Sequence, residues 1–494
     1  MLTIGYDIGS SSIKCSIFDC EQGVVVAHGS YPAEEMPMNS PHPGWAEQDP
    51  ELWWRYIVAI TRKLLTEGEI DARRISAVGI SYQMHGLVLV DEGGAVLRPS
   101  IIWCDSRAVE MGKEAFAALG GDFCLQHLLN SPGNFTAAKL RWVKVNEPEV
   151  YKRIHKAMLP GEFIAMKMTG DIVSTISGMS EGIYWDFQRS AVSAELLDHF
   201  GIDRGLLPEI RPTFSVQGKV SASAAAQLGL AAGTVVSYRA GDQPNNALSL
   251  NVLDPGEVAA TAGTSGVVYG VIDTVSYDPR SRVNPFAHVN HAEGHTRLGV
   301  LLCINGTGIL NTWLRRNIAT GMSYDEMNRI ADGAGIGSGG ISILPFGNGA
   351  ERILENKEIG CRIFGVDFNR HTRAHLLRAG QEGIAFSFKY GIDIMKDMGL
   401  DLHVIRAGYA NMFLSPVFRQ TLANIADATI ELYDTDGSQG AARGAGLGAG
   451  LFASPREAFG SLKQKGKLGP KAPDADATRA AYALWRERLT SSMQ

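Results

Sequence analysis

Apolar positions along the chain follow two alternating patterns. Short apolar runs predict strands at 2–7, 14–18, 24–28, 75–80, 100–103, 235–238, 341–345 and 404–407. Apolar residues at helical spacing predict helices that begin near Pro50 and that cover 381–398, 419–428, 437–450 and 476–489. Because strands alternate with helices, the pattern indicates an α/β protein. The helix predicted at 437–450 is rich in small residues, which indicates tight packing on its neighbours.

Two turns rich in Gly and hydroxyl residues lie about half a chain apart, at 9–12 and 263–266. Each offers small residues and backbone N–H groups that can approach phosphate closely. The carboxylate of Asp7, just before the first turn, can sit beside phosphate only with a cation between them, which indicates Mg²⁺. One such turn is more typical of a plain hairpin. The pair, taken with Asp242, predicts two similar domains facing one nucleotide.

Asp242 is the best candidate for a chemical base. It follows a β-branched strand and precedes Gln243 and Pro244, which halt regular strand pairing. A carboxylate there can accept a proton from a hydroxyl that attacks a γ-phosphate. The alternative is an Asx turn that caps the following helix, and spacing alone does not separate the two.

Other polar residues also gather where strands end, which is where open α/β sheets bind ligands. His85 could donate to a sugar oxygen, although a lone His is more often structural, and Met84 more often fills core. Asp105 could hold hydroxyls, or could pair with Arg107 at a helix start. Lys14 could neutralise phosphate or lie solvated on its strand. Charged clusters at 351–352 and 355–358 are predicted to be solvated faces.

Composition excludes several classes of protein. The 494 residues suffice for two large domains or about three average ones. The net charge of -6 disfavours a nucleic-acid coat, so an ATP site must rely on local donors and a metal. The six cysteines form no CxxC pair, so neither zinc nor a disulfide framework is predicted, and a reducing cytoplasm fits. We expect no membrane span and no signal peptide.

Six motifs together resemble the FGGY family of carbohydrate kinases. They lie at 7–14, 43–50, 83–86, 102–107, 241–243 and 263–266, and their order and spacing match over about residues 1–450. Gln83-Met84-His85-Gly86 is similar to the branch of the family that acts on xylulose, whereas the glycerol branch has an Arg-Glu pair in place of Met84-His85.

The resemblance implies two ribonuclease-H-like domains of the actin and sugar-kinase superfamily, with the active site in the cleft between them. Residues 1–248 would bind the sugar and carry the metal and phosphate loop, and 249–494 would bind the nucleotide. The implied reaction is ATP- and Mg²⁺-dependent phosphorylation of D-xylulose at its 5-hydroxyl, in the cytoplasm. The expected partner is a small-molecule sugar, with no nucleic acid and no membrane, and a homodimer is left open.

The resemblance also implies roles for individual residues. Asp242 would be the general base and Asp7 would orient the metal. The sugar would contact Met84, His85, Asp105, Asp242 and Gln243. The nucleotide and its phosphates would lie near Ser11, Ser12, Lys14, Gly263, Thr264, Gly408 and Asn411.

Three departures from the family pattern leave alternatives open. Gln243 stands where the xylulose branch usually has Asn, and 349–354 replaces a Gly-Glu-Arg-Thr-Pro motif, so another ketose or polyol such as ribulose, glycerol or gluconate is an alternative substrate. Residues 406–411 replace the Gly-Gly-Gly-Ala adenosine loop, which affects the nucleotide contacts. An actin- or chaperone-like ATPase that acts through partner binding is the alternative of another class. The polar strand ends at 82–107 argue against it, since such a protein needs no sugar-sized polar pocket.

Overall fold

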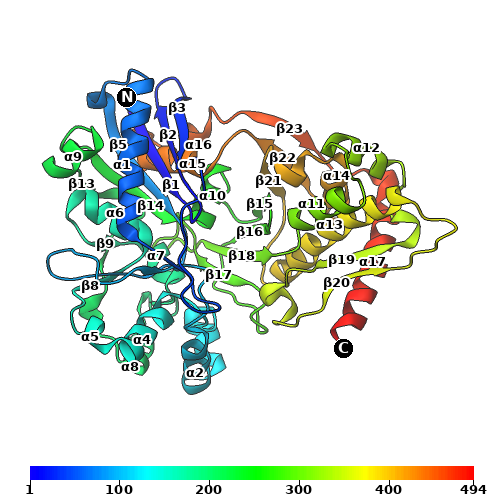
Figure 1. Cartoon of the computed structure of the whole chain (residues 1–494), viewed down its shortest axis with the longest axis horizontal. Helices are drawn as coiled ribbons and strands as arrows, with labels where there is room; N and C mark the ends of the chain where they lie inside the picture. The colour runs from blue at the N-terminus through cyan, green and yellow to red at the C-terminus, as the bar shows by residue number, and fades with distance from the viewer.

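Two lobes, each built around one mixed β-sheet, make up the computed structural model, which describes residues 1–494 (Figure 1). The six strands of the first sheet are, in spatial order, β13 (Phe214–Lys219), β14 (Val235–Gly241), β5 (Ile75–Tyr82), β1 (Leu2–Ile8), β2 (Ile13–Asp19) and β3 (Val24–Tyr31). Strands β14, β5 and β1 run parallel to one another, while β13, β2 and β3 pair antiparallel at the two sides.

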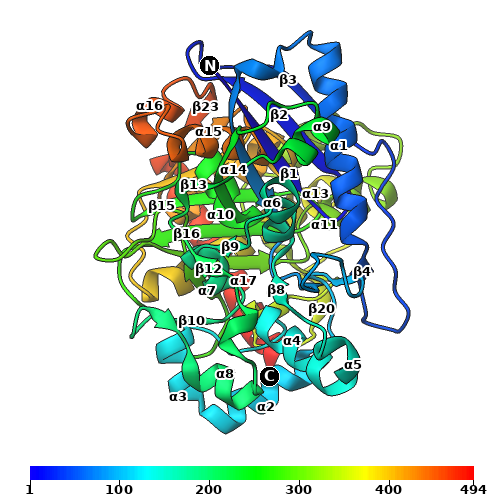
Figure 2. The same ribbon diagram turned by 90° about the vertical axis from the view of Figure 1, so that its left-hand side faces the viewer.

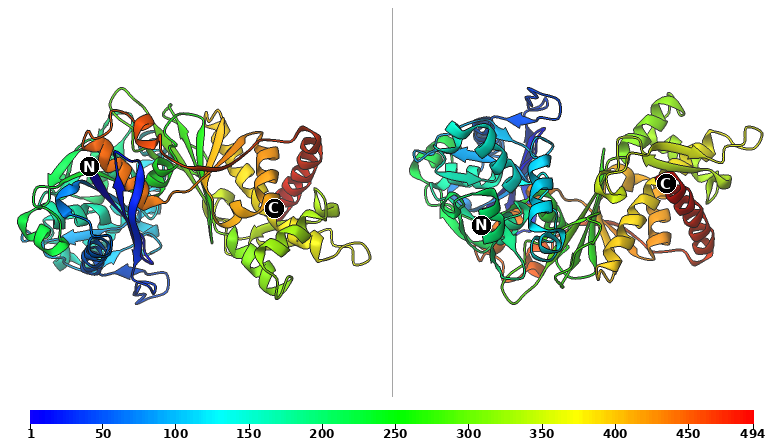
Figure 3. Two further views of the ribbon diagram at one scale, coloured as in Figure 1. Left: turned by 90° about the horizontal axis from the view of Figure 1, so that it is seen from above. Right: turned by 90° about the horizontal axis from the view of Figure 1, so that it is seen from below.

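The second lobe repeats this plan with one more strand. Its sheet has the order β17 (Asn284–Ala287), β18 (Leu298–Ile304), β16 (Gly266–Ile272), β15 (Glu257–Ala262), β21 (Val404–Gly408), β22 (Thr429–Tyr433) and β23 (Gln464–Leu468). Strands β15, β21 and β22 are parallel at its centre. Seen from above and below, the two lobes lie side by side (Figure 3). The predicted α/β class is confirmed, and the predicted turn at 263–266 joins the antiparallel strands β15 and β16.

Helix α1 (Pro50–Glu67) forms where the sequence predicts it. Asp49 caps it by accepting a hydrogen bond from the N–H of Glu51, at 2.9 Å, and Pro50 occupies the first turn, where its missing N–H costs nothing. The buried face of α1, which includes Trp53 and Ile60, packs on the first sheet beside β3 and α9 (Ala222–Leu228) (Figure 2).

Other helices surround the two sheets. The first lobe adds α6 (Pro160–Thr169) and an insertion with α2 (Val109–Leu119), α3 (Gly121–Phe123), α4 (Thr136–Asn146), α5 (Pro148–Tyr151), α7 (Ile176–Glu181) and α8 (Ala194–Phe200). The second lobe has α11 (Gly308–Asn317), α12 (Tyr324–Asp332), α13 (Arg373–Asp397), α14 (Pro416–Ala426) and α17 (Ala472–Met493), and α10 (Asp242–Ser249) leads into it. None of these helices combines the length and the apolar composition that crossing a bilayer requires.

Short strands complete the structure in five two-stranded pairs. They are β4 (Glu47–Gln48) with β7 (Ser100–Ile101), β6 (Val88–Val90) with β8 (Lys156–Met158), β9 (Val173–Ser174) with β12 (Glu209–Ile210), β10 (Trp185–Asp186) with β11 (Ala191–Val192), and β19 (Ser342–Phe346) with β20 (Gly360–Phe364). Strand β7 ends two residues before the predicted strand end at Trp103, because Ile102 and Asp105 close a turn with a backbone hydrogen bond of 3.2 Å. Helix α13 begins eight residues before Gln381, the predicted start of this helix. The apolar spacing is interrupted there by two charged residues, Arg378 and Glu382, which are buried as a pair.

The insertion of the first lobe is fastened to the second lobe. The hydroxyl of Ser177 donates to the carbonyl of Ala287 at 2.9 Å, and the N–H of Ala287 donates to the hydroxyl of Ser180 at 2.8 Å. The side chain of Asn130 donates to the carbonyl of Pro285 at 2.7 Å. Strand β17 therefore lies directly against α7, so the lobes are joined on one side by fixed contacts.

Helix α15 (Gly437–Gly448) follows the second sheet along the chain, yet it packs on the first sheet (Figure 1). Glycines of the sheet permit this close packing, because a Cβ on Gly5 or Gly79 would overlap the backbone of α15. After α16 (Pro455–Phe459), the chain returns to the second lobe, where β23 pairs with β22. The tight packing predicted for this helix is confirmed. The division into domains at 248 and 249 stays a prediction. Helix α15 is an exception to it, because it belongs to the second half of the chain but packs in the first lobe.

Candidate active site

A cavity of about 260 Å³ opens between the lobes, at the end of β1. Its walls come from both halves of the chain: Asp7, Lys14, Asn246, Ser249, Leu250, Ala260, Thr261, Ala262, Gly408, Ala410, Asn411, Phe413, Thr435, Asp436 and Gly437. Four residues predicted from the sequence to serve the metal or the nucleotide, Asp7, Lys14, Gly408 and Asn411, are thus brought to one cavity.

The register of the first sheet positions Asp7. Its neighbours across the strands are Lys14 on β2 and Ser81 on β5, and the hydroxyl of Ser81 donates to Oδ1 of Asp7 at 2.9 Å. Burial raises the pKa of Asp7 above its ordinary value, and the charge of Asp436 adds to the rise, while Lys14 and Ser81 oppose it. A second cation near this carboxylate would therefore stabilise its ionised form.

The start of α15 forms another wall of the cavity. Asp436 caps the helix by accepting from the N–H of Gln439 at 3.0 Å and from the hydroxyl of Ser438 at 2.7 Å. A Cβ on Gly437 would lie 2.6 Å from Oδ2 of Asp7, so a residue larger than glycine would displace this carboxylate. Because the N-terminus of α15 lines the cavity, the positive end of the helix dipole adds to the attraction for anions there.

Asp242 is the first residue of α10 and directly follows β14. Burial raises its pKa to about 7, and the charge of Asp7 adds to the rise, while hydrogen bonds from Gln243 oppose it. A carboxylate with a pKa near 7 suits proton transfer at neutral pH. The N-cap position belongs to Gly241 and makes no side-chain hydrogen bond, so the alternative of a capping Asx turn is not what the structure shows.

His85 lies at the end of the neighbouring strand β5, in the left-handed region of the backbone map with a φ of 62°. Its Nδ1 lies 2.9 Å from the carbonyl oxygen of Glu181. Because a carbonyl can only accept, Nδ1 carries the proton and Nε2 is free to accept. Burial lowers the pKa of His85 to about 3, and Lys139 and Arg352 lower it further. The ring is therefore neutral, and its free nitrogen accepts rather than donates, opposite to the role considered from the sequence.

Glu181 is a buried site residue that the sequence did not reveal. Its carboxylate accepts from the hydroxyl of Tyr82 at 2.6 Å and from the backbone N–H of His85 at 3.2 Å. Burial raises the pKa of Glu181 well above its ordinary value. Met84 is also buried, and a Cβ on Gly241 would lie 2.5 Å from its Cγ. The segment at 84–85 therefore packs against the residue that precedes Asp242.

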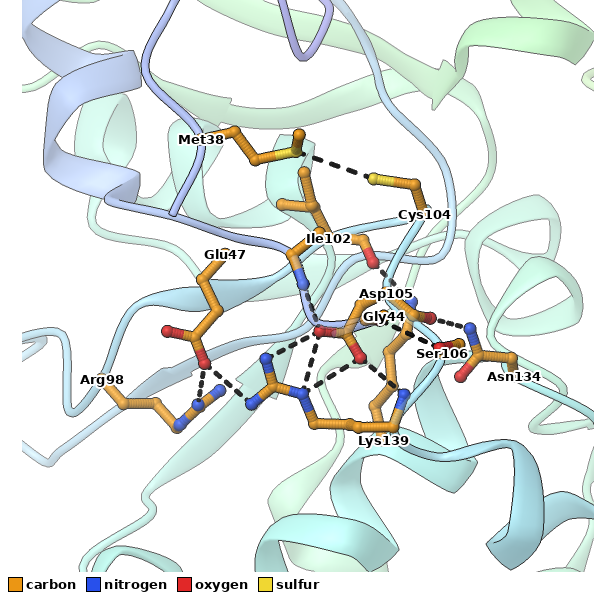
Figure 4. Close-up of polar contacts among 12 residues, drawn as sticks. Met38, Gly44, Glu47, Arg98, Ile102, Cys104, Asp105, Ser106, Asn134 and Lys139 are labelled. Atoms are coloured by element: carbon orange, nitrogen blue, oxygen red, sulfur yellow. Dashed lines mark hydrogen bonds and ion pairs between the residues drawn. The ribbon is translucent and has the colours of Figure 1, made fainter. Parts of the chain in front are cut away.

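Asp105 is fully buried and holds a loop (Figure 4). The guanidinium of Arg107 donates to both of its oxygens at 2.7 to 3.0 Å, and the N–H of Ala46 donates at 2.6 Å. Arg107 also bonds Glu47 at 2.7 Å and lies 3.8 Å above the ring of Trp45. Of the two uses considered for Asp105, the structure shows the pairing with Arg107, and no free carboxylate oxygen is left there for a sugar.

Lys139 is a second residue that the sequence did not reveal. It is fully buried, and its ammonium donates to the carbonyl oxygens of His85 at 2.8 Å and Ile102 at 2.9 Å (Figure 4 shows the second contact). Burial lowers the pKa of Lys139 to about 7, and the charge of Asp105 opposes this shift. Lys139 therefore ties together the two loops that follow β5 and β7.

Two family models match the chain and together cover most of it. The FGGY family of carbohydrate kinases, N-terminal domain, matches residues 2–249, and the C-terminal domain of the same family matches residues 258–451. The chain belongs to the FGGY family of carbohydrate kinases. It is therefore an ATP-dependent kinase that acts on a small-molecule sugar, and the alternative of a partner-binding ATPase is not favoured.

Relatives of this FGGY kinase match it over nearly its whole length. The xylulose kinase of Bacillus subtilis (strain 168) is 27% identical over 99% of this chain and 96% of its own. The xylulose kinase of Escherichia coli (strain K12) is 29% identical over 98% of this chain and 97% of its own. The crystal structure of xylulose kinase from Rhodospirillum rubrum superposes with a TM-score of 0.90 at 27% identity, covering 99% of each chain. The predicted family and two-domain sugar-kinase fold are confirmed.

Nine of the predicted residues of this kinase lie outside the lining of the cavity: Ser11, Ser12, Met84, His85, Asp105, Asp242, Gln243, Gly263 and Thr264. The carbonyls of Gly263 and Thr264 accept from the N–H groups of Gly308 and Ile309, at 2.8 and 3.2 Å, which fixes their turn to the start of α11. The carbonyl of Ser11 accepts from the N–H of Met36 at 2.8 Å. Their contacts with ligand stay predictions.

A larger cavity of the kinase, about 600 Å³, lies elsewhere in the second lobe. Tyr409 lines it together with basic residues such as Arg419 and Lys467, whereas Gly408 and Asn411 line the smaller cavity. No residue predicted to take part in chemistry lines the larger cavity. We therefore assign the active site to the cavity that contains Asp7.

Of the charged pair at 351–352, one residue is solvated as predicted and the other is not. Glu351 is exposed, but Arg352 is half-buried and its guanidinium lies 5.2 Å above the ring of Phe135 in the first lobe. The prediction of a solvated face is wrong for Arg352, because its partner lies more than two hundred residues earlier in the chain and sequence spacing cannot show it.

Proposed function

We propose that the protein transfers the γ-phosphate of ATP to the 5-hydroxyl of D-xylulose, giving D-xylulose 5-phosphate. The observation that carries this proposal is the place of Asp242, a carboxylate with a pKa of about 7. Met84 packs on the preceding Gly241, and the charge of Asp7 acts on Asp242. The base is thus coupled to both the sugar side and the phosphate side. The choice of sugar is supported by relatives named xylulose kinase.

In this proposal Asp242 accepts the proton of the attacking hydroxyl. The free Nε2 of His85 accepts a hydrogen bond from another hydroxyl of the sugar, and Met84 contacts its carbon chain. Lys14, Gly408 and Asn411 face the phosphates and the nucleoside.

Mg²⁺ fits the phosphate side of the site. Asp7 and Asp436 line the same cavity, and the charge of Asp436 raises the pKa of Asp7, so a divalent cation between them would relieve their repulsion. The structure gathers no group of three or more His, Cys, Asp or Glu side chains that could hold a metal by themselves. Mg²⁺ usually takes one or two carboxylates and completes its ligands with phosphate and water, so it would neutralise the phosphates of bound ATP.

Replacing Asp7 by Ala should weaken the dependence on Mg²⁺. The concentration of Mg²⁺ for half-maximal rate should rise by ~10–100-fold, as is typical when a group that holds or orients a metal is removed. The rate is measured against Mg²⁺ in both proteins at saturating sugar, and KM for the sugar serves as the internal control. An unchanged Mg²⁺ profile would leave Asp7 a structural turn residue.

The pH dependence should show the ionisation of Asp242. Below about pH 7 its carboxyl is protonated and cannot accept a proton, so kcat/KM for the sugar should rise with pH through about 7. The residual activity of an Asp242→Asn variant should lack this step. A profile that is flat between pH 6 and 8 in the wild type would contradict the assignment.

The proposed function is tested by ADP release with a panel of acceptors: D-xylulose, D-ribulose, L-ribulose, L-xylulose, glycerol and gluconate. The highest kcat/KM should belong to D-xylulose. A higher value for another acceptor would replace the sugar in the proposal, and ATP turnover that no sugar increases would refute a sugar kinase.

We also propose that residues 1–248 and 249–494 act as the two functional domains. Helix α15 is the exception, because it packs in the first lobe although it follows residue 249. A cytoplasmic location is supported by the six cysteines, all of them free thiols. Sedimentation would distinguish a monomer from the homodimer that the family resemblance leaves open.

A further inference from the structure

Arg352 reaches from the second lobe onto the wall of the sugar site. It lies in the 3₁₀ turn η5 (Glu351–Leu354), and its guanidinium stands 5.2 Å above the ring of Phe135. That ring in turn lies 4.8 Å from the ring of His85, at a near-perpendicular angle of 78°. A Cβ on Gly133 would lie 2.5 Å from Nη2 of Arg352, so the glycine leaves room for the guanidinium.

The guanidinium of Arg352 has no hydrogen-bond or ion-pair partner in the protein. Burial lowers its pKa, and only the charge of the exposed Glu351 opposes this. By contrast, the buried Arg107 nearby bonds to both Asp105 and Glu47. The half-buried guanidinium faces the ring of Phe135, but its N–H groups have no acceptor in the protein, so an acceptor supplied by a ligand would explain why Arg352 is held there.

The turn that presents Arg352 is wound through unfavourable backbone conformations. Glu351, Glu355 and Asn356 all have positive φ, at 46°, 56° and 62°. Residues other than glycine rarely adopt this region, and such positions gather at ligand sites where surrounding structure holds them. The strain supports a role for this turn beyond connecting β19 to β20.

The sugar side of the site has few free hydrogen-bond donors, because the side chain of Gln243 already bonds Asp242. On the sugar side, the free Nε2 of His85 and the carboxylate of Asp242 are both acceptors once Asp242 is ionised. They can bind hydroxyl groups, which donate. A ketose also has a carbonyl oxygen, which can only accept, and the five N–H donors of a guanidinium suit it.

We propose that Arg352 determines specificity by donating to the carbonyl end of the ketose, so that the second lobe contributes directly to sugar recognition. This inference rests on the proposed function. It implies that the kinase favours a pentulose over its reduced polyol, and that this preference depends on Arg352.

The test replaces Arg352 by Gln and by Lys. Arg352→Gln should lower kcat/KM for D-xylulose by on the order of 10–100-fold, mainly through KM, as expected for a lost hydrogen bond to a charged donor. The loss for xylitol, which has no carbonyl, should be several-fold smaller, and KM for ATP should be unchanged. Arg352→Lys keeps the charge but loses the planar fork, so it should fall between wild type and Arg352→Gln.

Arg362→Gln is the matched control, since Arg362 is exposed on β20 of the same lobe. Binding of D-xylulose without ATP, measured by calorimetry, should weaken only in the Arg352 variants. Equal losses for D-xylulose and xylitol, or an unchanged KM for D-xylulose, would overturn the inference. If Arg352→Gln fails to fold, the losses for D-xylulose and xylitol are compared in Arg352→Lys instead. A wild type that phosphorylates no pentulose would refute the proposed function instead.

Discussion

Replacing Asp242 by Asn should lower kcat by ~10²–10⁴-fold, the usual effect of removing a positioned base. Asn has nearly the same shape but cannot accept the proton of the attacking hydroxyl. Affinity for ATP should stay near that of the wild type, because the nucleotide side of the cavity is built from Gly408, Asn411 and the start of α15. Single-turnover rates and nucleotide titrations on both proteins measure the two quantities separately.

Stability provides the control for this variant. The folded-state pKa of Asp242 is raised from 3.8 to about 7, so the folded protein holds this proton more tightly than the unfolded chain does. The resulting stabilisation is complete below the unfolded pKa and is lost as pH rises through about 7. Asp242→Asn should therefore unfold at the same temperature as the wild type or higher at pH 8. Retention of more than about a tenth of wild-type kcat would refute Asp242 as the base.

Replacing His85 by Ala should raise KM for D-xylulose and lower kcat/KM by on the order of 10-fold or more, about the effect of one buried hydrogen bond. Glu181 fixes the ring through Nδ1, so Nε2 is the group lost to the sugar. A site that bonds a substrate hydroxyl discriminates strongly, because its own polar group is otherwise unpaired. The comparison is kcat/KM for D-xylulose and D-ribulose, with KM for ATP expected to be unchanged.

His85→Asn controls for backbone strain in this experiment. The φ of 62° at His85 is tolerated better by Asn than by Ala, so His85→Asn should fold at least as well. If both variants keep the wild-type preference between the two sugars, His85 is a structural residue, and the choice of xylulose loses its main support within the site.

The sequence predicted the parts of the site that depend on local pattern. Strand β1, the turn after it and the paired strand β2 are contiguous, so Asp7 and Lys14 could be placed together without knowing the fold. Asp242 could be predicted for the same reason, as a polar residue where a β-branched strand ends. The polar strand end at Met84 and His85 was found in this way too, but not which nitrogen of His85 is free.

Lys139, Glu181 and Arg352 could not be predicted, because each is defined by residues far away in the chain. Lys139 lies in α4 among apolar residues and gives no sign that its ammonium meets the carbonyls of His85 and Ile102. Glu181 gains its role through Tyr82, which lies 99 residues earlier. Burial of a charged side chain depends on tertiary partners, and no period in the sequence records these.

The position of α15 also constrains how the protein can be made. This helix, α16 and the loop between them supply Ala441, Ala442, Phe459 and Phe452 to the core that includes Phe18 and Tyr238 of the first sheet. The strands made first on the ribosome therefore wait for residues near 440–460 before one face of their sheet is covered. Such late, long-range closure slows folding and leaves nascent apolar surface in need of protection. A chain truncated before Gly437 would thus lose the integrity of its beginning as well as its end.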